Sequence, residues 1–294
     1  MIDPRGLRVF LAVCRANSIT GGARLLNISQ PSVSNAIAQL ERAAGAVLFE
    51  RSRNGITLTP AGEALQVRAE AMENLLIDAE AQMRLAGARI SGPLRIGGTP
   101  GALVSLLPAS VAKLEDRIGQ FDLRVVERPD ADLGEMLRRG EIELAFVTTG
   151  LEAPPDDMEE LTASQDPFAL IVGPANHDLP GEVSLRDVAG MPWVLPEARG
   201  AFRRQVDALF MAAEVAVPQG AIRCDSLLST KAIVRGSRRI TVLPVQVASA
   251  ELSIGVLRAV EIREARFQRS IGIRKLKSAR LSVVAKALLE VIFA

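Results

Sequence analysis

Two residue types with distinctive chemistry are scarce in this sequence of 294 residues. It contains two cysteines, Cys14 and Cys224, and a single histidine, His177. Both cysteines lie in apolar stretches, which favours reduced, buried thiols in a cytosolic protein over a disulfide framework. His177 lies in a loop-like stretch without a second histidine nearby, so the common zinc motifs are excluded.

Long apolar runs and catalytic motifs are also missing. No run approaches the roughly 18 residues of a membrane-spanning helix, and the N-terminus lacks the features of a signal peptide. We therefore expect a cytoplasmic protein with no membrane partner. The sequence has no GxSxG or Walker-type loop, and the glycines of "RIGGTPG" lack the GxGxxG spacing. These absences argue against an enzyme.

Charge of one sign does not dominate the whole chain. The formal net charge is +1, with 48% apolar and 23% charged residues, an ordinary balance for a globular protein. Residues 1–59 nevertheless hold seven arginines against three acidic residues, a weak indication of a polyanionic partner. The length predicts two or three domains.

The first 59 residues contain three segments with helical periodicity. The first segment carries an apolar stripe at positions i, i+3, i+4 and i+7: Leu7, Phe10, Leu11 and Cys14. In the second segment, Gly21 and Gly22 cost about 1 kcal/mol each relative to alanine. The third is predicted to run from the N-cap Ser29 to the C-cap Gly45.

The third helix has two contrasting faces. It is expected to bury Val33, Ile37 and Leu40, which share one side. The opposite side carries small or hydrogen-bonding groups, with Ser32 and Gln39 at its margin: Pro31, Ser34, Asn35, Ala38 and Arg42. Such a face suits a groove that is itself negatively charged.

A hairpin is predicted after the third helix, because Asn54–Gly55 is typical of tight hairpin turns. Arg51 and Arg53 lie next to its tip. Three helices followed by a hairpin with a basic tip form a winged helix-turn-helix. In that motif the third helix enters the major groove, and a wing arginine reaches the minor groove or a phosphate.

A helix of about 27 residues is predicted next. Its apolar positions repeat every seven residues, with further apolar side chains beside them: Leu65, Met72, Ala79 and Ala86, then Leu75, Leu76 and Met83. We expect this stripe to pack against a second copy of the chain; packing on its own domain is the alternative. "SGP" at Ser91–Pro93 breaks the helix and predicts a domain boundary.

The remaining 200 residues alternate short apolar runs with helical patterns. Strands are predicted at 94–98, 122–127, 143–147, 168–173, 220–224, 239–243, 255–260 and 267–273, and a last helix at 278–292. This alternation predicts an α/β fold with largely parallel sheets in two lobes.

Long stretches of the sequence resemble the LysR-type transcriptional regulators. The resemblance is most specific in "NSITGGARLLNISQPSVSNAIAQLERAAGAVLFERSRNGITLTPAGEAL" and continues in "GPLRIGG", "SLLPASVAKL", "LRRGEIELAF" and "IVRGSRRITVLP". It implies a winged helix-turn-helix at residues 1–59, a dimerising linker helix at 60–90 and an effector domain at 91–294. The effector domain would be similar to periplasmic binding proteins, with one lobe at 91–161 and 267–294 and the other at 162–266.

The resemblance also implies sites. For DNA it points to Gln30, Pro31, Ser32, Ser34 and Asn35, with Arg51 and Arg53 on the wing. An amide such as that of Asn35 can pair with an adenine edge. For an effector between the lobes, helix N-termini and strand ends indicate Thr99, Pro100, Arg128, Thr148, Phe202 and Arg203.

Several features depart from the family or stay open. Gly21 and Gly22 stand where helix formers are usual, which would loosen the second helix. Ser237 and Arg239 replace usual glycines, which puts a tight turn in doubt and adds a charge. With Arg128 and Arg203 this favours an anionic effector, such as a small carboxylate. Eight basic residues in 258–280 favour a solvated face or an inter-subunit contact.

The prediction is a cytoplasmic regulator, activator or repressor, that is not an enzyme. Its partners would be double-stranded promoter DNA, further copies of itself in a dimer or tetramer, and RNA polymerase, and it would need no metal or cofactor beyond the effector. The alternative is a small-molecule binding protein or an enzyme with the same lobes and a non-functional helix-turn-helix.

Overall fold

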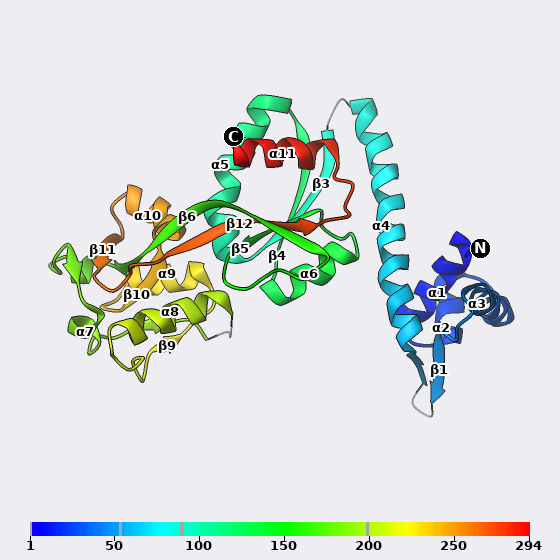
Figure 1. Cartoon of the computed structure of the whole chain (residues 1–294), viewed down its shortest axis with the longest axis horizontal. Coiled ribbons are helices and arrows are strands. Elements are labelled where there is room, and N and C mark those ends of the chain that lie inside the picture. Colours follow the sequence, from blue (N-terminus) through cyan, green and yellow to red (C-terminus); the bar gives the residue numbers. More distant parts are fainter. Residues whose placement is uncertain (1, 53–54, 89–90, 198–199) are drawn as a thin grey trace. The chain divides into compact units, whose positions relative to one another are not determined.

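A computed structural model describes residues 2–52, 55–88, 91–197 and 200–294 (Figure 1). Internal contacts divide the chain into two units. The first comprises Met1–Pro93 and Gly134–Ile142, and the second comprises Leu94–Leu133 and Glu143–Ala294.

The first unit begins with three helices, as predicted: α1 (Pro4–Ala16), α2 (Ile19–Leu26) and α3 (Gln30–Ala44). Local capping sets their limits. The side chains of Asp3, Ser18 and Ser29 each accept a hydrogen bond from the first turn of the helix that follows. Left-handed residues end the helices at Asn17, Asn27 and Gly45. The buried stripes of all three helices meet in one hydrophobic core.

Gly22 allows α1 and α2 to pack closely, a role that its low helix propensity does not indicate. It is buried in α2, and a Cβ there would lie 2.9 Å from Val13 Cγ2 and 3.1 Å from the Val13 backbone. The missing side chain therefore lets α1 and α2 approach closely. The expectation of a loosened second helix considers helix propensity, which does not include this contact between helices.

The predicted hairpin and long helix follow. Strands β1 (Phe49–Ser52) and β2 (Gly55–Leu58) pair antiparallel, and the Phe49 ring packs 5.1 Å from that of Phe10. Helix α4 (Pro60–Ala88) begins after Thr59, whose hydroxyl accepts from Gly62 N and donates to the Val47 carbonyl. Thr59 thereby connects the start of α4 to Val47, in the segment that joins α3 to the hairpin.

The apolar stripe of α4 has two different environments. Near its start, Leu65, Ala69 and Met72 pack on the three-helix core, as in the alternative of packing on its own domain. Farther along, several large apolar side chains are exposed: Leu75, Leu76, Ile77 and Met83.

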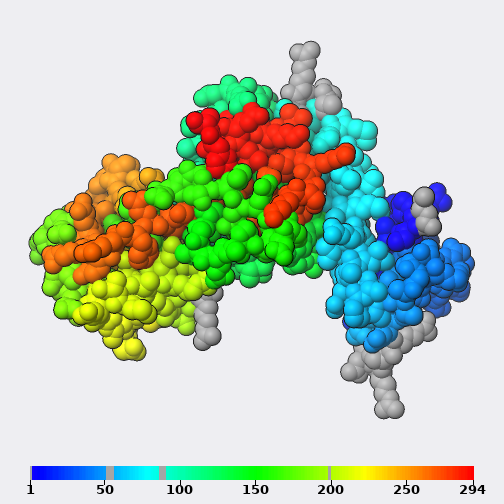
Figure 2. Space-filling model, in the orientation of Figure 1, coloured from blue at the N-terminus to red at the C-terminus, as the bar shows by residue number. Residues whose placement is uncertain are grey.

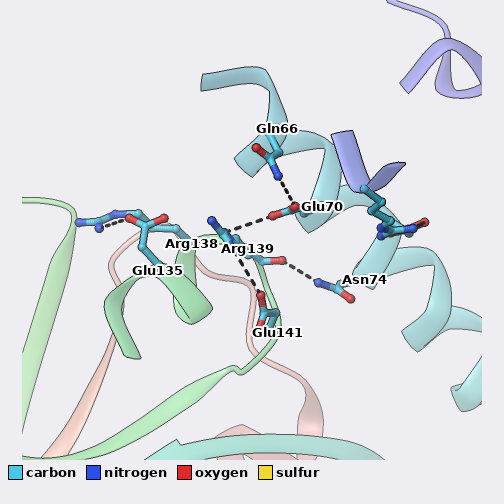
Figure 3. Close-up of polar contacts among 9 residues, drawn as sticks. Gln66, Glu70, Asn74, Glu135, Arg138, Arg139 and Glu141 are labelled. Atoms are coloured by element: carbon cyan, nitrogen blue, oxygen red, sulfur yellow. Dashed lines mark hydrogen bonds and ion pairs between the residues drawn. The ribbon is translucent and has the colours of Figure 1, made fainter. Parts of the chain in front are cut away.

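Residues 134–142 also pack on α4 within the first unit (Figure 3). Arg139 Nε lies 3.1 Å from a carboxylate oxygen of Glu70, and Asn74 Nδ2 donates to the Arg139 carbonyl over 2.8 Å. Gly140 has φ +63°, and a Cβ there would meet Ala71 at 3.7 Å. The backbone at Gly140 is therefore left-handed and lies against α4. Glycine adopts this conformation more easily than other residues do.

The second unit has two sheet-based lobes. In the first lobe the strand order is β4-β3-β5-β12-β6. Its helices α5 and α11 contact each other over a shared core (Figures 1 and 2). The elements are β3 (Ser91–Gly98), α5 (Pro100–Ile118), β4 (Phe121–Glu127), β5 (Leu144–Thr148), β12 (Gln268–Leu276) and α11 (Val283–Phe293). Helix α6 (Asp130–Arg138) begins in the second unit, and its residues from Gly134 onward belong to the first.

In the second lobe, β10 and β11 flank the far half of β6, and β7 pairs with β11. The elements are β6 (Met158–Val172), η1 (Pro174–Asn176), β7 (Glu182–Val183), α7 (Leu185–Val188), β8 (Val194–Leu195), α8 (Ala201–Ala212), β9 (Ile222–Arg223), α9 (Leu227–Arg235), β10 (Ile240–Pro244), η2 (Val245–Ala248), α10 (Ser249–Ser253) and β11 (Arg258–Ile262).

The expectation of largely parallel sheets is wrong for the ladders of β6 and β12. Strand β12 runs antiparallel to both β5 and β6, and β10 and β11 run antiparallel to β6. The physical reason is that β6 carries the chain from the first lobe into the second. Strand β12 later carries the chain back along β6, so it must run in the opposite direction. The polar first half of β6, residues 158–167, lacked the apolar run used to predict strands.

Candidate nucleic-acid interface and effector site

Helix α3 presents the polar face that the sequence predicts. Burial of Val33, Ile37 and Leu40 against the core sets the rotation of the helix about its axis. Gln30, Pro31, Ser32 and Asn35 are consequently exposed, and Ser34 is half-buried.

Hydrogen bonds distinguish these side chains. Gln30 Nε2 donates to Ser34 Oγ over 3.2 Å, and the hydroxyls of Ser29 and Ser32 lie 2.7 Å apart. Asn35 makes no side-chain hydrogen bond with another described residue. Its amide is therefore available for a bidentate contact.

The wing is described only in part. Arg51 lies in β1 opposite Ile56, and the register pairs Ser52 with Gly55. Arg53 lies outside the described residues.

A hollow of about 300 Å³ lies where α1, the hairpin and the start of α4 meet. Its lining includes Val13, Cys14, Phe49, Leu58 and Gln66. Burial raises the pKa of the Cys14 thiol to about 12, with a smaller contribution from the negative charge of Glu70. The thiol is therefore protonated at physiological pH.

Three predicted effector residues lie at one edge of the first-lobe sheet. Thr99 N donates to the Phe146 carbonyl, and Arg128 N donates to the Gly98 carbonyl. Because β3 and β5 are parallel, their carboxyl ends bring Thr99, Arg128 and Thr148 to the same edge. Pro100 follows as the first residue of α5.

Thr99 and Arg128 have few hydrogen-bond partners for their side chains at this edge. Thr99 stands at the N-cap position of α5, but its hydroxyl forms no capping hydrogen bond. The hydroxyl therefore stays available to a ligand. Arg128 is exposed, and its guanidinium donates only to the backbone carbonyl of Glu127 among the described residues.

The two residues predicted from the second lobe have close internal partners. Phe202 is half-buried, with its ring stacked 6.5 Å from that of Phe168. Arg203 Nε lies 2.9 Å from both carboxylate oxygens of Asp207, and its Nη1 donates to the Pro196 carbonyl. A guanidinium that is paired with a carboxylate attracts an anion less strongly than an unpaired one. A role for Arg203 in effector binding therefore stays a prediction.

A surface hollow of about 750 Å³ lies beside the start of α8. Three arginines line it, and each has an acidic partner: Arg203 with Asp207, Arg204 with Glu152 and Arg223 with Glu197. Its lining is therefore close to neutral rather than strongly positive.

Ser237 and Arg239 replace glycine without strain. Ser237 Oγ donates to the Ile233 carbonyl and accepts from Arg239 N, while Arg239 Nη1 donates to the Trp193 carbonyl. The preceding Gly236 has φ −93°, so this turn needs no left-handed backbone. The side chain of Arg239 is thus held by the backbone of its own lobe.

Four of the eight basic residues in 258–280 have acidic partners within the chain. Arg274 pairs with Glu160 and Asp130, Lys275 with Glu159, and Arg263 with Glu182. Internal ion pairs, rather than only a solvated face, explain much of this stretch.

Sequence reasoning did not identify the buried pair of Asp166 and Arg269. Their side chains are 0% and 4% exposed, and Arg269 Nη2 lies 3.4 Å from Asp166 Oδ2. A carboxylate just before an apolar strand and an arginine within a basic stretch are ordinary in a sequence. Only the register of β6 and β12 places them opposite each other.

A cluster of metal ligands and a membrane-spanning helix are both absent from the described ranges. No three His, Cys, Asp or Glu side chains there are grouped as ligands for a metal ion. Within the same ranges, no helix combines the length and apolar character needed to cross a membrane.

Comparison with known families covers nearly the whole chain. Residues 4–63 match the bacterial regulatory helix-turn-helix protein, lysR family, and residues 87–294 match the LysR substrate binding domain. The chain belongs to the LysR family. This LysR-type protein is a DNA-binding transcriptional regulator with an effector-binding domain.

Its curated relatives are mostly regulators of moderate similarity. A probable hydrogen peroxide-inducible genes activator of Mycobacterium avium is 28% identical over 91% of this chain and 86% of its own length. The HTH-type transcriptional regulator PcaQ of Agrobacterium fabrum is 26% identical over 98% of this chain and 93% of its own.

Solved structures share the fold. A full-length variant of OxyR from Pseudomonas aeruginosa gives a TM-score of 0.71 at 21% identity, covering 99% of this chain and 95% of that one. Full-length CbnR complexed with its target DNA gives 0.69 at 21% identity and 99% coverage of both chains. At this identity the likeness supports the fold only.

Proposed function

We propose that this regulator binds promoter DNA through α3 and the β1–β2 hairpin, and that a small effector in its second unit changes that binding. The observation that carries the proposal is the exposed polar face of α3, held in place by the buried stripe on its other side. A helix presented in this way fits the major groove of B-form DNA.

In the proposed complex, different residues of α3 contact the bases and the phosphate backbone. Asn35, whose amide is free, pairs with an adenine edge, and Gln30 contacts a base from the helix start. Pro31, Ser32 and Ser34 lie close to the phosphate backbone or base edges. Arg51 and Arg53 reach the minor groove or a phosphate from the wing.

Self-association would proceed through α4. The exposed side chains of Leu75, Leu76 and Met83 lie on one side of the helix and leave an apolar surface there, which a second α4 would cover. A two-fold dimer would place two α3 helices on a pseudo-palindromic site. The division into residues 1–59, 60–90 and 91–294 belongs to this proposal.

The effector would bind at the sheet edge that carries Thr99, Arg128 and Thr148. The free N–H groups at the start of α5, next to Pro100, and the unpaired Thr99 hydroxyl suit an anion such as a small carboxylate. Phe202 and Arg203 would contribute from the second lobe. Binding would shift the lobe arrangement and, through it, contact with RNA polymerase.

Genome-wide mapping of bound DNA tests the proposal in the native cell. We expect sharp peaks upstream of promoters for the native protein and their loss for the Asn35→Ala, Arg53→Ala double variant. Gln120→Ala, at an exposed position of the second unit, is the matched control and should keep the peaks. An absence of peaks, together with no binding of promoter fragments by the purified protein at low salt, would overturn the proposal.

A further inference from the structure

We propose that Asp166 and Arg269, with Ser105, Gly101 and Gln246, form a polar cluster that sets the arrangement of the two lobes and couples it to the first turn of α5. We name these five residues the inter-lobe cluster. Its role in setting the lobes is independent of the effector. Its role in transmitting effector binding rests on the proposed function.

The pair lies where β6 passes from one lobe to the other. Up to Pro167, β6 pairs with β12 of the first lobe, and from Phe168 onward it pairs with β10 of the second. Asp166 stands directly opposite Arg269 at the end of the first of these ladders. Both side chains are almost completely buried, so water does not compensate their charges.

The carboxylate of Asp166 is shared between the lobes. Its Oδ1 accepts from Gln246 N over 3.0 Å, in the turn η2 that follows β10. Its Oδ2 accepts from Ser105 Oγ over 3.3 Å, on α5 of the first lobe. The side chains of η2 pack in the second-lobe core and those of α5 in the first. One buried carboxylate therefore holds both lobes by directional bonds.

Arg269 connects this carboxylate to the start of α5. Its Nη2 donates to the Gly101 carbonyl and to Ser105 Oγ, both over 3.1 Å. A Cβ at Gly101 would lie only 2.4 Å from Arg269 Nη1, so the guanidinium lies directly against the first turn. Gly101 is two residues from Thr99. A movement of this turn therefore moves the hydrogen-bond acceptors of Arg269.

The electrostatics of Asp166 and Arg269 indicate that stabilising the fold is not the only role of this pair. Burial raises the pKa of Asp166 and lowers that of Arg269 to about 10. Both shifts mean that the cost of removing the charges from water exceeds what their mutual attraction returns. Arg269 Nε is also buried without a hydrogen-bond partner among the described residues. Apolar side chains would hold the lobes together, but without directional bonds that specify one arrangement.

The test measures the distance between the lobes in the full-length protein without any effector. Spin labels at Lys113→Cys in the first lobe and Met211→Cys in the second, in a Cys14→Ser, Cys224→Ser background, give a distance distribution by pulsed electron paramagnetic resonance. Labelled chains are diluted with unlabelled ones, so that only distances within a chain are recorded. Thermal unfolding is followed in parallel.

We expect Asp166→Asn and Arg269→Gln each to broaden or shift the distribution by several ångströms. The Asp166→Asn, Arg269→Gln double variant should recover stability, because no unpaired charge stays buried, yet keep the altered distribution. The matched control is Glu159→Gln, which removes another ion pair between the same two strands, with Lys275, inside one lobe. It should leave the distribution unchanged.

A glycine substitution tests the link to α5 separately. Gly101→Ala should alter the distribution as Arg269→Gln does, while Gly181→Ala, where a Cβ meets open space, should not. Unchanged distributions in the variants of Asp166 and Arg269, or an equal change in Glu159→Gln, would overturn the proposal. An unchanged distribution in Gly101→Ala alone would remove the coupling to α5. Failure of promoter binding in the mapping experiment would not affect any of these outcomes.

Discussion

At the scale of single residues, exposure and hydrogen bonding separate the groups that can read DNA from those already in use. On α3, Gln30 and Ser34 bond to each other, whereas the amide of Asn35 is free. Both kinds of residue were predicted from the resemblance and from the helical face. The sequence could not show which of the side chains already had partners, because that depends on rotamers and on the helix start.

Asn35→Ala is expected to weaken binding to the mapped promoter site by about 5- to 150-fold, because a bidentate base contact contributes about 1–3 kcal/mol. The measurement is fluorescence anisotropy on a labelled duplex at one fixed salt concentration. Gln120→Ala serves as the control with unchanged affinity. An equal affinity for the two variants would remove Asn35 from the recognition surface.

The thiol of Cys14 offers a prediction about pH. Its pKa is raised from 9.0 to about 12 by burial, so only about one thiol in ten thousand is ionised at pH 8, against about one in ten for an exposed thiol. We expect alkylation by iodoacetamide to be slow in the folded protein and fast in urea, as followed by mass spectrometry. Rapid alkylation of folded Cys14 at pH 8 would contradict this.

The sign of the linked effect on stability follows from the same shift. The protonated thiol is favoured in the folded state, so its contribution is fully present below pH 9 and is lost as the pH rises toward about 12.

At the scale of elements, the limits of helices were predictable and their close packing was not. Ser29 and Gly45 cap α3 as expected, since caps act over a few neighbouring residues. Gly22 was taken as a weak point of α2, because helix propensity does not include the approach of another helix. The close contact with Val13 gives this glycine a packing role in addition.

Gly22→Ala is expected to lower the free energy of unfolding by up to about 2 kcal/mol. A gain of about 1 kcal/mol in helix propensity is outweighed by the collision with Val13, because overpacking costs about 1–3 kcal/mol. The control is Gly6→Ala in α1, where a Cβ would make an ordinary contact with Leu40 at 3.7 Å. That variant should gain about 0.5–1 kcal/mol. Urea denaturation measures both, and a stabilised Gly22→Ala protein would refute the packing argument.

At the scale of the whole molecule, strand directions and long-range pairs organise the effector domain. The prediction of two lobes was correct, because alternating strand and helix patterns are local. The prediction of largely parallel sheets holds for the pairs β3–β5, β7–β11 and β8–β9 and is wrong for the ladders of β6 and β12. The polar half of β6 has no apolar periodicity, and its partner β12 follows about a hundred residues later.

The exposed surface of α4 gives a prediction about assembly. Leu75→Glu combined with Met83→Glu should weaken self-association by about 100-fold or more, because burying each side chain contributes about 1.5–3 kcal/mol. Sedimentation velocity over a concentration series measures this. Val283→Glu, an equally exposed apolar position on α11, is the control. If both proteins associate equally well, α4 is not the principal dimer contact.

The sequence by itself determined the helix caps, the buried stripes and the polar face of α3, because each depends on residues a few positions apart. It also determined the family, through runs of residues collinear with known regulators. The tertiary structure alone decided the close contact at Gly22, the antiparallel course of β6 and β12, and the burial of Asp166 beside Arg269, 103 residues away. These features depend on which distant segments share a core, and the free energy of burying them together is not encoded in any local pattern.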